Sequence, residues 1–201
     1  GAIASLTLVA NRGEARVRLE RVDHEPQPAR AVVACGPPEK DRADWLIEKL
    51  AELGISEFQP LDCVRGRWDR VHTRRDRWQR LAVAALRQSC RAWLLRVRET
   101  RTTGGWLAEL EKAGSRWLAD PAGESPRIPV DEVPREEGPA SGAVAQGAPA
   151  GSAQLDLVAV GPASGFSAAE RDQFLRAGFR PVRLASGRLR TETAALAWAS
   201  I

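Results

Sequence analysis

The sequence predicts an α/β domain built on a parallel sheet, and three features of the chain indicate it. Apolar runs with the length and composition of buried strands occur at residues 31–36, 55–61 and 155–160. Segments with helical spacing of apolar residues follow them along the chain. The last of these runs leads into a glycine-containing loop and then into a helix. Such alternation of strand and helix is typical of a parallel sheet.

Two helices are expected in the first half of this domain. The first covers about residues 41–53, with Asp41 in the N-cap position and Gly54 as the C-terminal cap. The second covers about residues 73–93 and carries Trp78 on its apolar stripe. Each helix therefore has one face suited to packing on the sheet, and Trp78 is interpreted as a core residue.

The middle of the chain is expected to contain a strand followed by a long loop. Trp117 and Leu118 fit a buried strand. Residues 121–153 are dominated by Pro, Gly, Ala, Ser and Glu and show no periodic segment. This low-complexity composition predicts a surface loop.

The last part of the chain returns to strands and helices. Ser167 and Glu170 have the spacing of a capping box, and Gly178 would end the helix that they begin. A strand is then expected at residues 181–184, and Thr191 opens a final helix. These elements complete the α/β domain, to which residues 30–201 are assigned.

A β-hairpin is predicted before this domain. Residues 3–22 alternate apolar and polar side chains around the turn sequence Asn11-Arg12-Gly13. Two strands are too few for a stable domain of their own. Residues 1–29 are therefore expected to be the remnant of a small β domain, or a hairpin packed on the main body.

Composition limits the class of protein. The apolar share is 43% and the charged share is 28%, which disfavours a disordered chain. No apolar run approaches the roughly 20 residues of a membrane-spanning helix, and the first ten residues do not resemble a secretory signal. No membrane partner and a cytoplasmic location are therefore expected.

The three cysteines are not arranged for a disulfide framework or a zinc site. Cys35, Cys63 and Cys90 lie far apart in the sequence and form no C-x-x-C or Cys/His pattern. We interpret them as reduced packing residues and expect no metal.

A basic segment points to a polyanionic partner. The stretch 65–101 holds twelve arginines against three acidic residues and includes three tryptophans. Arginine forks match phosphate oxygens, and aromatic rings stack on bases, so the composition suits RNA. Gln88 and Arg91 are three residues apart and would share a face of the predicted helix. The alternative is a solvated basic helix face with tryptophans in the core.

The loops after the last two strands are the second candidate site. In parallel sheets ligands bind beyond the carboxyl ends of strands, where glycines let the backbone approach a ligand. Residues 161–165 and 185–190 occupy these positions, without the glycine pattern of a phosphate-binding loop. An adenosine moiety held by backbone hydrogen bonds is one interpretation, and an ordinary turn is the other.

The segment Arg190-Thr191-Glu192-Thr193 begins the final helix and also has two interpretations. Thr191 could simply cap the helix while Glu192 interacts with its dipole. Alternatively, Arg190 steadies an anionic base and Glu192 orients it.

In this order the segments resemble the 16S rRNA uridine-N3 methyltransferase family of the SPOUT class. Four family motifs are matched across residues 30–201: Lys40 with Lys49-Leu50-Ala51-Glu52-Leu53-Gly54 and Pro60-Leu61; Arg77-Trp78 with Gln88-Ser89-Cys90-Arg91; Gly161-Pro162-Ala163-Ser164-Gly165-Phe166-Ser167 with Glu170; and Leu189-Arg190-Thr191-Glu192-Thr193-Ala194.

The resemblance implies a fold, a cofactor and partners. It implies a carboxyl-terminal trefoil knot, a preceding PUA-like β domain, a homodimer, and 16S ribosomal RNA or the small ribosomal subunit as substrate. Catalytic roles fall to Arg190 and Glu192, and RNA binding to Arg77, Gln88 and Arg91. S-adenosylmethionine would be held by Val160, Gly161, Pro162, Gly165, Leu184, Ala185, Leu189, Arg190, Thr193 and Ala194.

Two departures from the family pattern keep an alternative open. Ala163-Ser164 replaces Glu-Gly, and Ala185 replaces a glycine. The added side chains are expected to crowd the cofactor or to be incompatible with a positive φ. The alternative function is a non-catalytic RNA-binding module that has lost the cofactor. An α/β enzyme acting on a small nucleotide is a third interpretation, but it leaves the basic segment unexplained.

Overall fold

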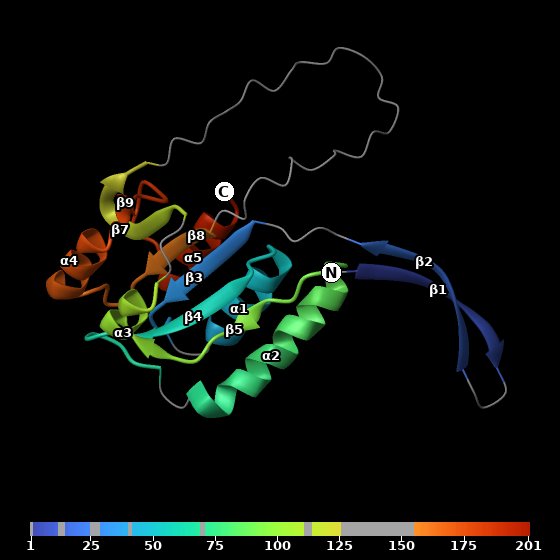
Figure 1. Cartoon of the computed structure of the whole chain (residues 1–201). Helices are drawn as coiled ribbons and strands as arrows, with labels where there is room; N and C mark the ends of the chain where they lie inside the picture. The colour runs from blue at the N-terminus through green and yellow to red at the C-terminus, as the bar shows by residue number, and fades with distance from the viewer. Residues whose placement is uncertain are drawn as a thin grey trace, which may run out of the picture.

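The computed structural model describes residues 2–11, 15–24, 29–39, 42–68, 71–110, 114–125 and 155–201. They form an α/β body and a β-hairpin that projects from it (Figure 1). The expected α/β class with a parallel sheet is confirmed. Lys40, Asp41, the hairpin turn at residues 12–14 and most of the predicted long loop lie outside the described residues.

The body is organised around a sheet with the strand order β5-β4-β3-β8-β7-β9, whose paired strands are all parallel. The strands are β3 (Arg30–Cys35), β4 (Glu57–Asp62), β5 (Arg96–Val97), β7 (Arg116–Glu124), β8 (Leu155–Val160) and β9 (Arg180–Val182). A short strand β6 (Arg101–Thr102) also pairs with β4. Because the strands are parallel, the loops that follow β3, β4, β8 and β9 gather at one edge of the sheet.

Helices cover both faces of the sheet, as expected for a parallel sheet. One core layer joins α1 (Arg42–Glu52), α2 (Val71–Gln88) and α5 (Thr191–Ala199) to side chains such as Val33 and Val158. The other layer joins α3 (Thr103–Ala108) and α4 (Ala168–Arg176) to the alternate strand residues, such as Val32 and Leu157. The near-continuous apolar runs of β3 and β8 follow from this burial on both faces.

Two tryptophans of the basic segment lie in the core. The rings of Trp68 and Trp78 pack edge to face at 5.2 Å, and each contacts Phe58 in the same way. The indole N–H of Trp78 donates to Asp44 Oδ1 at 2.8 Å, and that of Trp68 donates to the Cys35 carbonyl at 3.0 Å. The core interpretation of Trp78 is confirmed, and neither ring is free to stack on a base.

The predicted end of the second helix was wrong. Helix α2 ends at Gln88, and Cys90 then turns the chain with a φ of 54°. Arg91 lies beyond the helix and donates to the carbonyls of Glu52 and Leu53 at 2.8 and 3.3 Å. Gln88 and Arg91 therefore do not share a helix face, and Arg91 instead binds carbonyls at the end of α1.

Gly54 explains why a glycine ends the first helix. It has a φ of 82°, and an added Cβ would overlap the guanidinium of Arg91. Arg91 thus joins the Lys-x-x-Glu-Leu-Gly segment to the Gln-Ser-x-Arg segment. This packing accounts for the presence of both segments without reference to a ligand.

The predicted loop at residues 121–153 begins too early. Strand β7 continues to Glu124, where it pairs again with Val182 of β9 after an irregularity in register. Residues 126–154 lie outside the described residues. The first four residues assigned to the loop therefore belong to the sheet.

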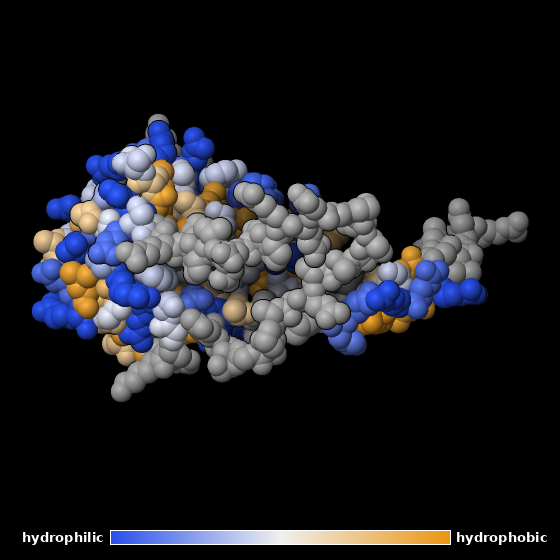
Figure 2. All heavy atoms as spheres, turned by 90° about the horizontal axis from the view of Figure 1, so that it is seen from above, coloured by the Kyte–Doolittle hydropathy of each residue, from blue (hydrophilic) through white to orange (hydrophobic). Residues whose placement is uncertain are grey.

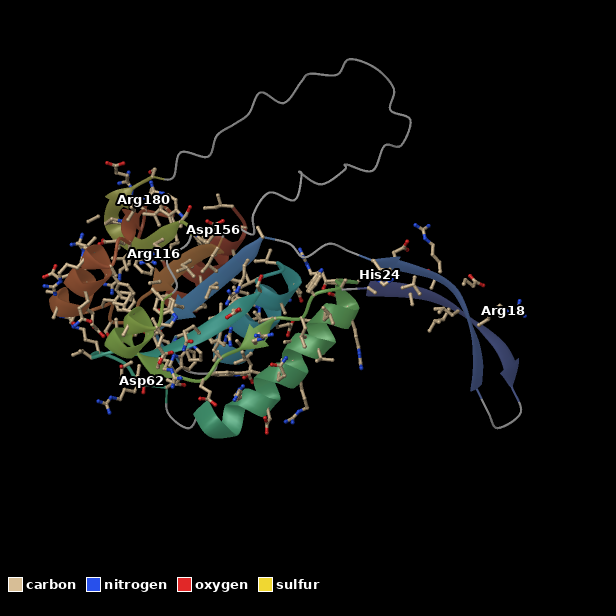
Figure 3. The ribbon with its side chains drawn as sticks, in the orientation of Figure 1. Arg18, His24, Asp62, Arg116, Asp156 and Arg180 are labelled. Carbon is tan, nitrogen blue, oxygen red and sulfur yellow. The ribbon has the colours of Figure 1, made fainter. Side chains whose placement is uncertain are left out.

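The predicted hairpin is confirmed. Strands β1 (Ala2–Asn11) and β2 (Ala15–His24) pair antiparallel and form a two-stranded sheet of their own. Leu6, Leu19 and Val22 of this sheet are exposed, and apolar and polar atoms lie side by side on it (Figure 2). Figure 3 shows Arg18 and His24 on the hairpin, apart from the α/β body. The assignment of residues 1–29 to a separate β domain stays a prediction.

Candidate functional site

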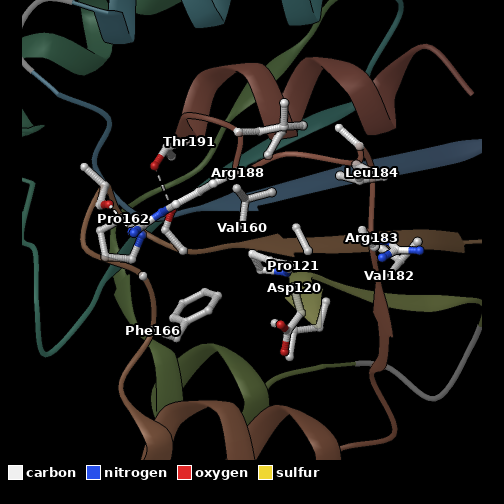
Figure 4. Close-up of a pocket in the computed structure, with 18 of the residues that line it drawn as sticks. Asp120, Pro121, Val160, Pro162, Phe166, Val182, Arg183, Leu184, Arg188 and Thr191 are labelled. Atoms are coloured by element: carbon white, nitrogen blue, oxygen red, sulfur yellow. Dashed lines mark hydrogen bonds between the residues drawn. The ribbon is translucent and has the colours of Figure 1, made fainter. Parts of the chain in front are cut away.

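A cavity of about 500 Å³ lies beyond the carboxyl ends of β8 and β9, beside β7 (Figure 4). This volume lies within the usual range for small-molecule sites. Its walls come from four segments: Leu118, Ala119, Asp120 and Pro121; Val160, Gly161, Pro162, Ala163, Gly165, Phe166 and Arg171; Val182, Arg183, Leu184, Ala185, Gly187, Arg188 and Leu189; and Thr191 and Ala194. The two loops singled out in the sequence therefore form two of the cavity walls.

The loop 161–165 is held in one conformation by its own backbone and by α5. The Gly165 N–H donates to the Pro162 carbonyl at 2.7 Å, and Gly165 has a φ of 75°. The Thr191 hydroxyl donates to the Gly161 carbonyl at 3.0 Å, as the dashed line in Figure 4 shows. The capping interpretation of Thr191 was wrong: Arg190 is the N-cap residue, without a side-chain cap, and Thr191 joins α5 to the loop.

The departures from the family pattern do not strain this loop. Among the described residues, Cys90 is the only non-glycine with a positive φ, so Ala163, Ser164 and Ala185 have ordinary backbone conformations. The expectation of a forbidden φ was wrong. Ala163 and Ala185 line the cavity, whereas the Ser164 hydroxyl donates to the Arg65 carbonyl at 2.8 Å. The cavity stays open with these side chains in place.

An ion pair between β7 and α4 forms the polar part of the cavity wall. Arg171 Nε lies 2.6 Å from Asp120 Oδ2, and the Ala122 N–H donates to Oδ1 at 2.8 Å. Burial alone would raise the pKa of Asp120, but these two hydrogen bonds prevail and hold it below its usual value. Asp120 therefore supplies a fixed negative charge, close to the exposed residues Arg183 and Arg188.

Eight of the ten residues expected to hold the cofactor line this cavity, and Arg190 and Thr193 do not. Thr193 is exposed on α5. Sequence reasoning missed the β7 residues, Phe166, Arg171 and Thr191. Leu118 was expected on a strand but not in the site, and Ala119, Asp120 and Pro121 fall at the boundary with the predicted loop, where composition alone gives no strand signal.

The two residues expected to be catalytic lie outside the cavity. Arg190 is 64% exposed and its Nη1 lies 3.4 Å from Glu39 Oε2. Glu192 is only 3% exposed. Burial, Cys63 and the carboxylate of Glu192 raise the pKa of the Cys35 thiol well above its usual value, so Glu192 lies near the end of β3.

The three residues expected to bind RNA differ in their surroundings. Arg77 is exposed and forms an ion pair with Asp44 at 2.7 Å, Gln88 is exposed, and Arg91 binds the α1 carbonyls. Arg80 and Arg87 are also exposed on α2, seven residues apart, and form no ion pair with a described residue. The helical spacing of these two arginines was a signal that the sequence reasoning did not use.

Glu170 connects the helix after the loop to two other parts of the body. It completes the predicted capping box with Ser167, which is confirmed. Its Oε1 also accepts from the Val64 N–H at 2.9 Å and from the Thr103 hydroxyl at 3.1 Å. Burial alone would raise the pKa of Glu170, but hydrogen bonds from Ser167, Val64 and Thr103 prevail and lower it.

Because the folded pKa of Glu170 is lowered, its ionised form stabilises the fold above the unfolded pKa of about 4.3, and this contribution is lost as the pH falls through the folded pKa. We expect Glu170→Gln to lower the free energy of unfolding at neutral pH by about 1–3 kcal/mol. Urea titrations from pH 7 down to about pH 3.5 should show a smaller loss in the variant than in the unaltered chain. Parallel pH profiles would contradict this role.

The cysteines have different environments. Cys35 and Cys63 are buried, as expected, whereas Cys90 is exposed at the turn after α2, so the packing interpretation was wrong for Cys90. In the part of the chain that the structure describes, no group of three His, Cys, Asp or Glu side chains could hold a metal. No described helix is long and apolar enough to cross a membrane.

Comparisons with known proteins agree with this architecture. A family model described as "RNA methyltransferase domain" matches residues 25–201. Over 84% of this chain, the sequence is 28% identical to ribosomal RNA small subunit methyltransferase E of Bacillus subtilis. Over 88% of this chain, it is 30% identical to the Synechocystis protein of the same name. It spans 63% and 54% of the length of these two proteins.

A solved structure shows the same fold. Ribosomal RNA small subunit methyltransferase E from Neisseria gonorrhoeae, bound to S-adenosyl methionine, superposes with a TM-score of 0.74 at 24% identity. The match covers 98% of this chain and 75% of that one. Because the family model matches the whole α/β body, which begins with β3, the chain belongs to the RNA methyltransferase domain family.

Proposed function

We propose that this chain is an S-adenosylmethionine-dependent RNA methyltransferase that methylates N3 of a uridine in 16S ribosomal RNA. The observation that carries the proposal is the open cavity formed by loop 161–165, residues 182–189 and the start of α5. The family and the names of the two curated relatives support it. The Neisseria gonorrhoeae structure supports the choice of cofactor, because that protein was solved with S-adenosyl methionine bound.

The residues of the cavity suit this cofactor. Val160, Leu184 and Leu189 offer apolar surface for an adenine ring, and the backbone of residues 161–165 offers N–H and C=O groups. The charged side chains of the lining are Asp120, which is paired with Arg171, and the exposed Arg183 and Arg188, which suit a carboxylate group on the ligand. The cofactor would supply an activated methyl group on a positively charged sulfur.

The chain's own contribution to the reaction is positioning and electrostatics. Holding two reactants in line lowers a barrier by about 7–11 kcal/mol in favourable systems. Arg190 would stabilise the negative charge that develops on the uracil ring as its N3 proton passes to solvent water. Glu192 is buried near the end of β3, so it would act on the base only indirectly, through the packing of the first turn of α5.

The basic surface of α2 would bind the RNA backbone. Arg77 and Gln88 are exposed there, together with Arg80 and Arg87. Arg91 would contribute charge while it holds the end of α1. The substrate would be 16S RNA, free or within the small ribosomal subunit, in the cytoplasm.

Three further features are proposed from the family resemblance. The segment that contains loop 161–165 and residues 182–194 would form a trefoil knot. Residues 1–29 would be the tail of a PUA-like β domain, and the protein would act as a homodimer. The separate two-stranded sheet of the hairpin supports the second of these proposals.

A calorimetric titration with S-adenosylmethionine tests the proposal against the non-catalytic alternative. The unaltered chain should bind in the micromolar range, because Ala163 and Ser164 leave the cavity open. The matched variant carries Ala163→Glu and Ser164→Gly, which restore the family residues, and it should bind within about tenfold of the unaltered chain. No binding by the unaltered chain, with binding by the restored variant, would favour a module that has lost the cofactor.

A further inference from the structure

A second recess lies on the other side of the loop that borders the cavity. It has a volume of about 460 Å³ and is formed by the loops after three neighbouring strands, β3, β4 and β8. Its lining residues are Pro37, Pro38, Glu39, Arg65, Gly66, Arg67, Pro162, Ala163 and Ser164. The recess and the cavity share Pro162 and Ala163, so one short loop separates the two spaces.

Close packing makes the floor of the recess rigid. A Cβ added to Gly36 would come within 2.5 Å of the Pro162 nitrogen. A Cβ added to Gly66 would lie 2.8 Å from Pro162 Cβ and 3.0 Å from Pro37 Cγ. The three loops are therefore in contact through prolines and glycines, and a ligand on this floor would have a fixed distance from the cavity.

The rim of the recess carries positive charge. Arg65 and Arg67 are exposed, and neither forms an ion pair with an acidic residue in the described ranges. The acidic residue of the lining, Glu39, is paired with Arg190 at 3.4 Å. Arg65 and Arg67 therefore retain their charge for an outside partner.

Ser164 fixes Arg65 in place. The Ser164 hydroxyl donates to the Arg65 carbonyl at 2.8 Å, and Arg65 Nη1 lies 3.5 Å from the Ser164 carbonyl. A glycine at position 164, as in the family pattern, could not make the first of these contacts. The departure from the pattern therefore joins the loop after β4 to the loop after β8.

We propose that this recess binds a backbone phosphate of the substrate RNA through Arg65 and Arg67, and that Ser164 is a positioning residue for Arg65. The inference rests on the proposed function, since it places the acceptor RNA across the loop from the cofactor cavity. A guanidinium fork matches two phosphate oxygens. Arg65 and Arg67, which have no carboxylate partner among the described residues, therefore suit a phosphate at this open recess. The neighbouring Arg190 would then face the nucleotide next to that phosphate.

The experiment compares three variants of the full chain in binding to small ribosomal subunits and in their methylation. Arg65→Ala removes the main phosphate contact, and Ser164→Ala removes only the hydroxyl that fixes it. Arg176→Ala is the matched control, because it removes an exposed arginine at the end of α4 that lines neither the recess nor the cavity. Affinity for the subunits is measured at several salt concentrations, and affinity for S-adenosylmethionine by calorimetry.

Arg65→Ala should weaken subunit binding about tenfold and reduce the slope of log affinity against log salt by about one. Ser164→Ala should raise KM for the subunits about threefold without changing kcat. All variants should bind S-adenosylmethionine like the unaltered chain. If Arg65→Ala matches Arg176→Ala in affinity and salt slope, the inference is overturned. Failure of the unaltered chain to bind S-adenosylmethionine would instead overturn the proposed function, while the salt slope would still test the recess.

Discussion

Arg190→Ala is expected to lower kcat for RNA methylation roughly 10²- to 10³-fold, which is the usual effect of removing a group that stabilises charge in a transition state. Arg190 is exposed at the N-cap of α5 and pairs with Glu39 at the rim of the recess, outside the cavity. Its loss should therefore leave the affinity for S-adenosylmethionine unchanged and most of the RNA affinity intact. Single-turnover assays with saturating cofactor and small ribosomal subunits measure the effect.

Two further variants make this result specific to Arg190. Arg190→Lys keeps the positive charge but loses the planar fork, so its kcat should fall between those of the unaltered chain and Arg190→Ala. Arg176→Ala removes an equal charge from α4 and should retain full kcat. Unchanged methylation by Arg190→Ala would exclude the proposed role of this residue.

Trp78→Ala is expected to lower the free energy of unfolding by about 3–5 kcal/mol, the range for removing a large aromatic side chain from a core. Trp78 is fully buried, packs edge to face on Phe58 and Trp68, and donates to Asp44. Its removal leaves a cavity between α2 and the sheet and an unpaired acceptor on Asp44. Denaturation in guanidinium chloride, followed by circular dichroism, measures the change.

Trp78→Phe is the matched variant, because it keeps an aromatic ring in the core and removes the indole N–H. Trp78→Phe should lower the free energy of unfolding less than Trp78→Ala does. The difference between the two variants separates the contribution of ring packing from that of the hydrogen bond. A loss below about 1 kcal/mol for Trp78→Ala would show that Trp78 is not a core residue and would return it to the candidates for base stacking.

Local patterns were sufficient for elements whose boundaries depend on nearby residues. The capping box of Ser167 and Glu170 begins α4 as expected, because both partners lie within one turn. The apolar runs of β3 and β8 were recognised because both strands are buried on both faces.

Boundaries set by distant contacts could not be predicted from local patterns. Helix α2 ends before Arg91 because this residue binds the carbonyl end of α1, about forty positions earlier in the chain. Strand β7 continues through Pro121 and Gly123 because β9 pairs with it. Neither partner is visible in the composition of the segment itself, so Trp93 was placed in a helix and Pro121 in a loop.

The candidate site was also predicted only where its residues form a local pattern. The loops after β8 and β9 were found from their glycines and their place after strands, and both line the cavity. The contribution of Asp120 and Arg171 was missed, because their ion pair forms only when β7 and α4 meet. The recess next to Arg65 was missed for the same reason, since three separate loops build it.

The central claim is tested most directly by methyl transfer. The purified chain is incubated with small ribosomal subunits and S-adenosylmethionine labelled in its methyl group, and the digested 16S RNA is analysed by mass spectrometry. We predict labelled methyl on N3 of a uridine, with little label when the Arg190→Ala variant is used. Binding of S-adenosylmethionine without any transfer of the label to 16S RNA would contradict the account.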